Sequence, residues 1–312
     1  MRLISIKTVG DIHNIGNIDI DFSKVSEMFN LVTGKDLNDY YISPIIPNDL
    51  IKVLKGLRDK TLYKPSNESL GIEDIAAITI TFECDGKIIT YTQTISENII
   101  TLETLYEDGE LYMFLNRLEW DDNYINPKAD EKIKKCFSAM CTYPTLMYCE
   151  PRLLKLSKYL EVKEIYNKQI YDISDAAKDI VEKLLINSNL GIERVDSNFC
   201  SVITTGGYSI SKINMGSGVK MIMDYFPYII DTIIKGNLCI INEDIFSVFH
   251  LHLMKSIVSL FKSLAEKYNS QVFILWYGNN EEYLLSCGDI KKENIIFPIR
   301  EGKSLIYDKR SS

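Results

Sequence analysis

The last third of the chain alternates short apolar segments with amphipathic ones, and this alternation limits the folds that it can adopt. Residues 238–241 (LCII) and 272–276 (VFILW) carry no charged side chain. Between them, 246–268 places apolar residues at helical spacing, as in a helix that covers a core with one face. Apolar strands joined by amphipathic helices are typical of a mostly parallel sheet covered by helices. The sequence therefore predicts an α/β arrangement with helices over 219–235 and 246–268 and a further strand at 294–298.

A different pattern fills the first part of the chain. Residues 76–114 contain four segments of β type, and the pairs Asp85-Gly86 and Asp108-Gly109 fall between them. Asp-Gly is a preferred sequence of tight hairpin turns. We therefore expect an antiparallel β-meander here.

Residues 116–199 differ from both of these parts. They are rich in Lys, Glu, Leu and Tyr, and segments such as 151–166 and 173–186 show helical spacing. We predict an α/β core formed by 1–115 and 200–312, with an inserted helical lobe over 116–199.

The charge of the chain argues against a protein whose main role is to coat nucleic acid. The 312 residues include 43 acidic and 35 basic side chains, for a formal net charge of -8. Phosphate binding uses clustered Lys and Arg, and the sequence has no long basic run. We find no apolar stretch typical of a signal peptide, and none approaches the roughly 18 residues of a membrane helix. The expected location is the cytoplasm, without membrane contact.

Three cysteines, Cys136, Cys141 and Cys149, lie close together in the sequence. A structural zinc site needs four ligands, commonly with a CxxC pair. The chain has no such pair and only three histidines. We interpret these cysteines as reduced, buried thiols and predict no metal site.

Several weak motifs follow one another in a recognisable order. The segment 1–34 leads through strands to Thr33-Gly34, and the β-meander follows. Later come Met215 to Lys220 (MGSGVK), a helix with Pro227 near its middle, the strand and acidic end LCIINED at 238–244, and Phe249-His250-Leu251. In this order the chain resembles the ABC/SMC-type ATPases of the abortive-infection and OLD-nuclease group. The resemblance implies a P-loop ATPase-like fold with a mixed sheet, an N-terminal β-meander and an inserted helical lobe.

The phosphate loop of such ATPases reads GxxxxGK[ST], in which backbone amides and the Lys hold the phosphates and the hydroxyl holds Mg²⁺. Aligned by the resemblance, the loop here begins at Gly34 and continues with Lys35. Asp39 then replaces the second glycine, Tyr40 the lysine and Tyr41 the Ser/Thr. A carboxylate and two bulky rings would occupy the place of a triphosphate. We interpret Gly34 as a turn residue and Lys35 as solvated.

Other positions that the resemblance assigns to nucleotide chemistry are also substituted. Asn242 stands where an Asp positions Mg²⁺, and Glu243 stands at the water-activating glutamate. The stretch expected to hold a phosphate-sensing His is 276–279, which includes Gly278 and contains no His. His250 and His252 lie on the predicted helix instead, where packing is the expected role.

The signature segment carries Gly216 where the resembled ATPases have a Ser that reaches the partner's nucleotide. Ser217 and Gly218 follow, so the segment is either a loop and helix cap or a remnant of a phosphate site. The resemblance implies head-to-head dimerisation through Gly216, Ser217 and Gly218.

These substitutions predict a pseudo-ATPase that acts as a dimerising or regulatory subunit, as a homodimer or beside an intact ATPase. The resembled group suggests bacterial defence against phage. We expect no cofactor. Three alternatives remain open: a divergent ATPase that uses Lys35, Glu243 and Mg-ATP, a nucleic-acid-binding module that needs no nucleotide, and an unrelated α/β protein.

Overall fold

The computed structural model describes most of the chain and divides it into two compact units. The described residues are 1–10, 18–22, 28–33, 76–96, 99–139, 146–160, 173–242, 245–276, 295–301 and 304–309. The first unit comprises 1–26, 33–161 and 293–312, and the second comprises 27–32 and 162–292.

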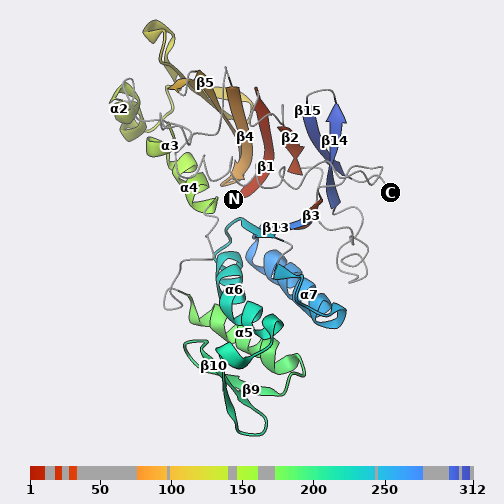
Figure 1. The fold of residues 1–312 in the computed structure, drawn as a ribbon. Coiled ribbons are helices and arrows are strands. Elements are labelled where there is room, and N and C mark those ends of the chain that lie inside the picture. Colours follow the sequence, from red (N-terminus) through yellow and green to blue (C-terminus); the bar gives the residue numbers. More distant parts are fainter. Residues whose placement is uncertain are drawn as a thin grey trace. The chain divides into compact units, whose positions relative to one another are not determined.

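The first unit is built on a mixed sheet (Figure 1) with the strand order β14-β15-β2-β1-β4-β5-β6-β7-β8. Strands β15 and β2 are parallel, whereas β14 and β15 and the pairs from β2 through β8 are antiparallel. The strands are β1 (Arg2–Val9), β2 (Ile18–Asp21), β4 (Ala76–Cys84), β5 (Lys87–Ser96), β6 (Ile99–Glu107), β7 (Glu110–Asn116), β8 (Tyr124–Ile125), β14 (Ile295–Glu301) and β15 (Ser304–Lys309).

The predicted β-meander is confirmed as β4 through β7. Asp85 and Gly86 join β4 to β5 with φ angles of 53° and 79°, and Asp108 and Gly109 join β6 to β7 with 51° and 83°. Two consecutive positive φ angles define the tight turn whose twist matches antiparallel strands. The Asp-Gly pairs therefore fix the register of both hairpins.

Helices of the first unit follow the meander. They are the short η3 (Trp120–Asp122), α2 (Glu131–Ala139), α3 (Leu146–Cys149) and α4 (Pro151–Tyr159). Helix α4 begins where the sequence predicts, because the side chain of Glu150 accepts a hydrogen bond from the amide of Arg152 and Pro151 occupies the first turn. It ends at Tyr159, earlier than the predicted residue 166. Its buried face consists of Leu153, Leu156 and Tyr159.

The described residues of the second unit form three α-helices, a group of three strands and a separate three-stranded sheet. The parallel pair β12 and β13 is confirmed, and β3 lies beside β13. The other sheet has the order β11-β10-β9 and is antiparallel. The elements are β3 (Phe29–Thr33), α5 (Asp175–Asn187), β9 (Ile192–Val195), β10 (Ser201–Thr204), β11 (Ser209–Ser211), η6 (Lys212–Asn214), α6 (Ser217–Ile234), β12 (Cys239–Asn242), α7 (Leu251–Tyr268) and β13 (Val272–Trp276).

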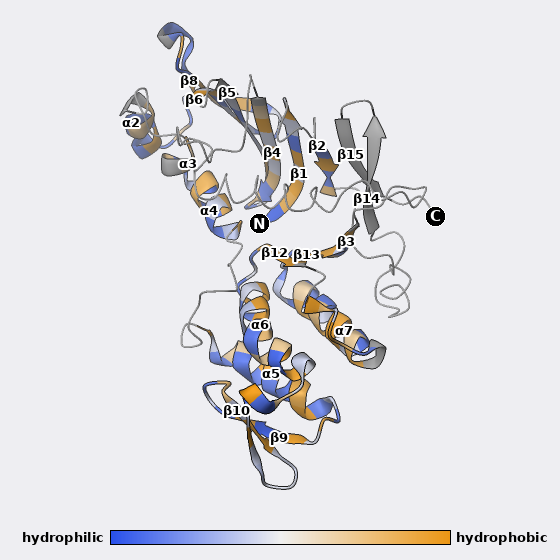
Figure 2. Cartoon of the chain, in the orientation of Figure 1, coloured by the Kyte–Doolittle hydropathy of each residue, from blue (hydrophilic) through white to orange (hydrophobic). Residues whose placement is uncertain are grey.

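Helix α6 forms the centre of the second unit and contacts α5, α7 and β12. Figure 2 shows β13 as almost wholly apolar, whereas α6 and α7 carry polar as well as apolar residues. This difference agrees with burial, because every residue of β13 is buried. The strand is covered on both faces, as its sequence predicts.

The start of α7 corrects the predicted helix over 246–268. The helix begins at Leu251, with His250 as its N-cap. Phe246 lies in a separate turn, in which the amide of Phe249 donates to the Phe246 carbonyl at 3.1 Å. Both rings are buried. The turn therefore needs apolar residues for packing, and their spacing in the sequence resembles that of one more helical turn.

The cysteines only partly follow the prediction. Cys136 and Cys149 are half-buried rather than buried, and Cys141 lies outside the described residues. Cys239 is buried, and burial raises the pKa of its thiol to about 12. In the described part of the chain, no three His, Cys, Asp or Glu side chains are placed to hold a metal ion.

The helices within 116–199 fall into both compact units, with α2, α3 and α4 in the first and α5 in the second. A separate lobe over 116–199 stays a prediction. Within the described ranges, no helix is long and apolar enough to cross a membrane.

Gly236 is expected to be sensitive to substitution. It follows α6 with φ of 67°, and a Cβ atom there would lie 3.2 Å from the backbone oxygen of Tyr268. Gly236→Ala should lower the free energy of unfolding by about 1–2 kcal/mol, since the left-handed conformation and the close contact both oppose a side chain. Urea denaturation measures the loss. Gly86→Ala, where φ is also positive but no atom lies within 4 Å, should cost less.

Candidate functional site

Much of the predicted nucleotide site lies outside the described residues. This holds for Gly34, Lys35, Asp39, Tyr40, Tyr41, Glu243 and Gly278. The roles assigned to them stay predictions.

The carboxyl ends of β12 and β13 are described. Asn242 is the last residue of β12, and its backbone pairs in parallel register with Leu275. Trp276 ends β13, and its indole N–H is buried with no hydrogen-bond partner among the described residues. Ligands in α/β folds bind at the carboxyl ends of parallel strands. Asn242 therefore lies at the carboxyl end of a parallel strand, and its place in a nucleotide site stays a prediction.

The signature residues form the start of α6. Gly216 is the N-cap, with φ of -63° and ψ of 154°, and no side chain caps the helix. Gly216 and Ser217 are exposed, whereas Gly218 is half-buried. A Cβ atom at Gly218 would lie 3.4 Å from the ring of Phe249. The first amides of a helix carry partial positive charge, so this end favours an anion or a hydrogen-bond acceptor.

Two sets of contacts hold this end of α6 in place. Lys212 of η6 pairs with Asp224 of α6 at 2.5 Å. Farther along the helix, the ring of Phe226 contacts those of Phe249 and Phe261, with ring centroids 5.8 and 5.2 Å away. The Lys212–Asp224 pair thus ties the segment before α6 to the helix, and Phe226 packs the middle of the helix.

Large apolar side chains are exposed on the segment that leads into α6. Ile213 is 80% exposed and Tyr208 is 74% exposed. Tyr208 follows the turn of the β10–β11 hairpin, where its ring lies close to Gly206, and Ile213 lies three residues before Gly216. Single exposed apolar residues are common on protein surfaces, so these two define a region to test.

Gly216→Ser introduces the serine that the resemblance predicts at this position, without a clash. The backbone of Gly216 already has N-cap geometry, and a Cβ atom would meet nothing within 4 Å. The serine hydroxyl is expected to cap α6 and raise the free energy of unfolding by a few tenths of a kcal/mol. Denaturant titration of both proteins measures the difference, and a loss of stability would contradict the N-cap geometry of Gly216.

A buried polar network in the first unit was not foreseen from the sequence. Glu103 of β6 has no exposed surface. Its Oε1 accepts hydrogen bonds from the Tyr91 hydroxyl at 2.5 Å and the Leu146 amide at 2.9 Å, and its Oε2 accepts one from Arg117 at 2.6 Å. Burial raises the pKa of the Glu103 carboxyl, although the Tyr91 and Arg117 donors oppose the rise. The sequence signal is limited to a glutamate in the middle of a strand that also carries two threonines.

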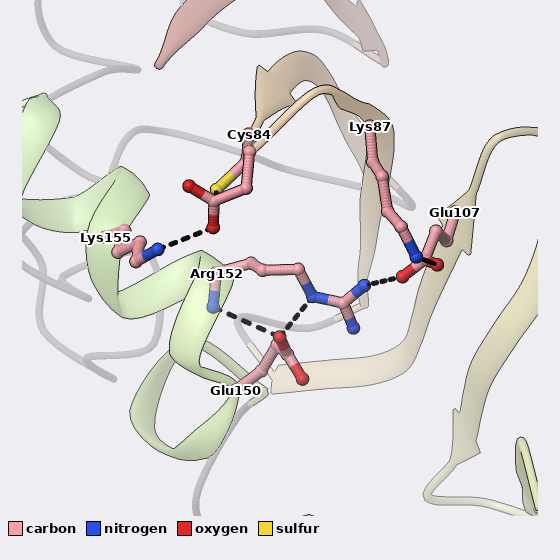
Figure 3. A network of polar contacts seen from close by, with 7 residues as sticks. Cys84, Lys87, Glu107, Glu150, Arg152 and Lys155 are labelled. Carbon is pink, nitrogen blue, oxygen red and sulfur yellow. Dashed lines mark hydrogen bonds and ion pairs between the residues drawn. The ribbon is translucent and has the colours of Figure 1, made fainter. Parts of the chain in front are cut away.

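A second polar cluster holds α4 against the meander (Figure 3). Arg152 pairs with Glu107 of β6 and, at 2.5 Å, with Glu150. Glu107 also pairs with Lys87 of β5. The Arg152 guanidinium lies 4.2 Å from the centroid of the Tyr112 ring. The charges thus pair with one another, which is the arrangement of a structural clamp.

Lys155 extends this clamp to the β4–β5 turn. Its Nζ lies 2.6 Å from Asp85, whose carboxylate also accepts a weak hydrogen bond from Cys84 at 3.6 Å. Both side chains of the Lys155–Asp85 pair are largely exposed, so this pair contributes little to stability.

Comparison with solved structures shows the fold of SMC head domains. The SMC head domain from Thermotoga maritima matches with a TM-score of 0.51 at 12% identity, over 100% of both chains. An SMC head bound to the C-terminal winged-helix domain of ScpA matches with 0.52 at 13%, over 100% of this chain and 98% of that one. A head with an extended coiled coil bound to the C-terminal domain of ScpA, derived from Pyrococcus furiosus, matches with 0.50 at 14%, over 99% and 96%.

No family model and no curated protein matches the chain. At these identities the structural likeness establishes the fold alone, which is that of SMC head domains.

Proposed function

We propose that this chain is an ATPase-like protein that does not hydrolyse ATP and works as a dimerising or regulatory subunit. The observation that carries the proposal is the sequence Asp39-Tyr40-Tyr41 where the phosphate loop of this fold requires Gly, Lys and Ser or Thr. The match to an SMC head domain over the whole chain supports the comparison at the level of the fold.

The substitutions act on every part of phosphate binding. A carboxylate at Asp39 would repel a triphosphate about 4 Å away by some kcal/mol at intermediate dielectric. Tyr40 provides no positive charge to offset that repulsion. Asn242 provides an amide where Mg²⁺ favours a carboxylate oxygen. Glu243 alone would have no bound phosphate to act on.

Hydrolysis is tested by measuring phosphate release from Mg-ATP. The purified chain should release phosphate no faster than its own Glu243→Gln variant, which lacks the candidate water-activating carboxylate. A wild-type rate that exceeds the variant's and also falls with Lys35→Ala would support the divergent ATPase instead.

A protein partner is the second part of the proposal. One similar SMC head is bound to a domain of ScpA, which shows that a head of this fold can carry a protein partner. We propose that this chain forms a homodimer or pairs with an intact ATPase through Gly216, Ser217 and Gly218, and that the complex takes part in defence against phage.

Ile213 tests the proposed contact surface. Ile213→Asp places a charge on a side chain that is 80% exposed, so folding should be unaffected while association through the α6 end should weaken about tenfold or more. Size-exclusion chromatography with light scattering measures self-association, and co-purification measures a heteromeric partner. Leu118→Asp is the matched control, because Leu118 is 75% exposed in the first unit. Equal association of both variants would rule out this surface.

A further inference from the structure

The network around Glu103 has a second arrangement of its hydrogens. In the arrangement described above, Tyr91 donates to Glu103 and accepts a hydrogen bond from Gln93 Nε2 at 2.6 Å. Gln93 lies directly opposite Glu103 in the β5–β6 register. The other end of its amide, Oε1, is buried and has no partner. A buried acceptor without a donor is uncommon and calls for a physical explanation.

A proton on Glu103 would supply the missing donor. On Oε2 the proton would face the Arg117 guanidinium, which is itself a donor. On Oε1 it would face the Tyr91 hydroxyl, which can accept as well as donate. Tyr91 would then turn its own hydrogen toward Gln93, whose amide flips to present Oε1. The oxygen and nitrogen of such an amide exchange places with little change in shape.

We propose that Glu103, Tyr91 and Gln93 form a proton-operated switch that sets how firmly the first residue of α3 is held on the β-meander. In the switching step one proton from solvent binds Glu103 Oε1. The Tyr91 hydroxyl then rotates, so that it donates to Gln93 instead of Glu103, and no covalent bond of the chain breaks. In the protonated arrangement Gln93 Oε1 accepts from Tyr91, and Gln93 Nε2 takes the position at which Oε1 has no partner among the described residues.

The switch acts on the hydrogen bond that the Leu146 amide donates to Glu103. The amide donates to the same Oε1 atom that takes the proton, and a protonated carboxyl oxygen is a weaker acceptor than a carboxylate. Leu146 begins α3, and α4 is the last helix before the chain passes into the second unit at Val162. Proton uptake therefore loosens the start of the segment that leads out of the first unit, while the Arg152–Glu107 pair still holds α4.

The direction of the pH dependence follows from burial. Among the described residues that bond to Glu103, the titratable and charged side chains are Tyr91 of β5 and Arg117, which follows β7, and α3 contributes the Leu146 amide. Burial raises the pKa of Glu103 above the ordinary carboxyl value, so the switch operates on mild acidification. Between the ordinary and the raised pKa the folded chain binds more protons than the unfolded chain, and this group favours folding more as the pH falls. The weakening of the Leu146 hydrogen bond is therefore a local change, because protonation of Glu103 does not disfavour folding of the chain.

The test is an NMR titration of the isotopically labelled full chain. It follows the glutamate carboxyl carbons and the exchange of the Leu146 amide, corrected for intrinsic exchange. One carboxyl should titrate above the usual range, be absent in Glu103→Gln and persist in Glu107→Gln. Protection of the Leu146 amide should fall about five- to tenfold with the same midpoint. A Leu146 amide that is insensitive to that titration would overturn the proposal.

Gln93→Met tests the triad without disturbing the ionised form, because Met has a similar volume and leaves the contacts from Tyr91, Arg117 and Leu146 to Glu103 in place. The protonated form would lose the acceptor for Tyr91. The midpoint of Glu103 should therefore move down by about 1–2 pH units. A midpoint that stays or rises would show that Gln93 does not take the Tyr91 hydrogen.

Discussion

Replacing Glu103 by alanine is expected to lower the free energy of unfolding by about 3–5 kcal/mol, because it removes the buried counter-charge of the Arg117 guanidinium. The variant also removes the acceptor for the Tyr91 hydroxyl and for the Leu146 amide. The side chains of Glu103 and Arg117 are 0% and 10% exposed, so water cannot replace the lost partner. Urea denaturation followed by circular dichroism measures the change.

Glu110→Ala is the matched control for this prediction. Glu110 is an exposed glutamate on the neighbouring strand β7, and its loss should change stability by no more than about 0.5 kcal/mol. If Glu103→Ala costs less than about 1 kcal/mol, the network does not stabilise the first unit and its geometry is wrong.

Phe226→Ala is expected to cost a similar amount, about 3–5 kcal/mol, in the second unit. The ring is fully buried on α6 and contacts Phe249 and Phe261. Removal would leave a cavity between α6 and α7. Because Gly218 lies against Phe249, we also expect altered amide chemical shifts at the signature residues.

Tyr208→Ala serves as the control for Phe226→Ala. Its ring is 74% exposed in the same unit, so truncation should leave the unfolding midpoint almost unchanged. Equal losses in the two variants would mean that the packing of Phe226 does not stabilise the second unit.

Local signals in the sequence were enough to predict many elements of the fold. Asp-Gly pairs specified the hairpin turns, because few residues tolerate two positive φ angles in a row. Gly236 marked the end of α6, and the apolar segments gave β12 and β13. The apolar periodicity predicted the start of α7 wrongly at Phe246. Its ring is buried in a turn, and burial alone does not distinguish a turn from a helix.

For the candidate functional residues, too, only features that are local in the sequence could be predicted. A signature could be proposed because Gly216 to Gly218 are contiguous in the sequence, and its role stays a prediction. The Glu103 network was missed because Tyr91, Arg117 and Leu146 are distant from Glu103 in the chain. Strand pairing brings Tyr91 near Glu103, and the fold brings Arg117 and the start of α3 to it. The substituted phosphate loop could be proposed from the resemblance, and it lies outside the described residues.

Isothermal titration calorimetry of the purified chain with Mg-ATP tests the central claim most directly. We predict no saturable heat up to millimolar ATP, because Asp39, Tyr40 and Tyr41 replace the groups that bind phosphate. Saturable binding in the micromolar range would contradict this claim and would make the chain a divergent nucleotide-binding protein.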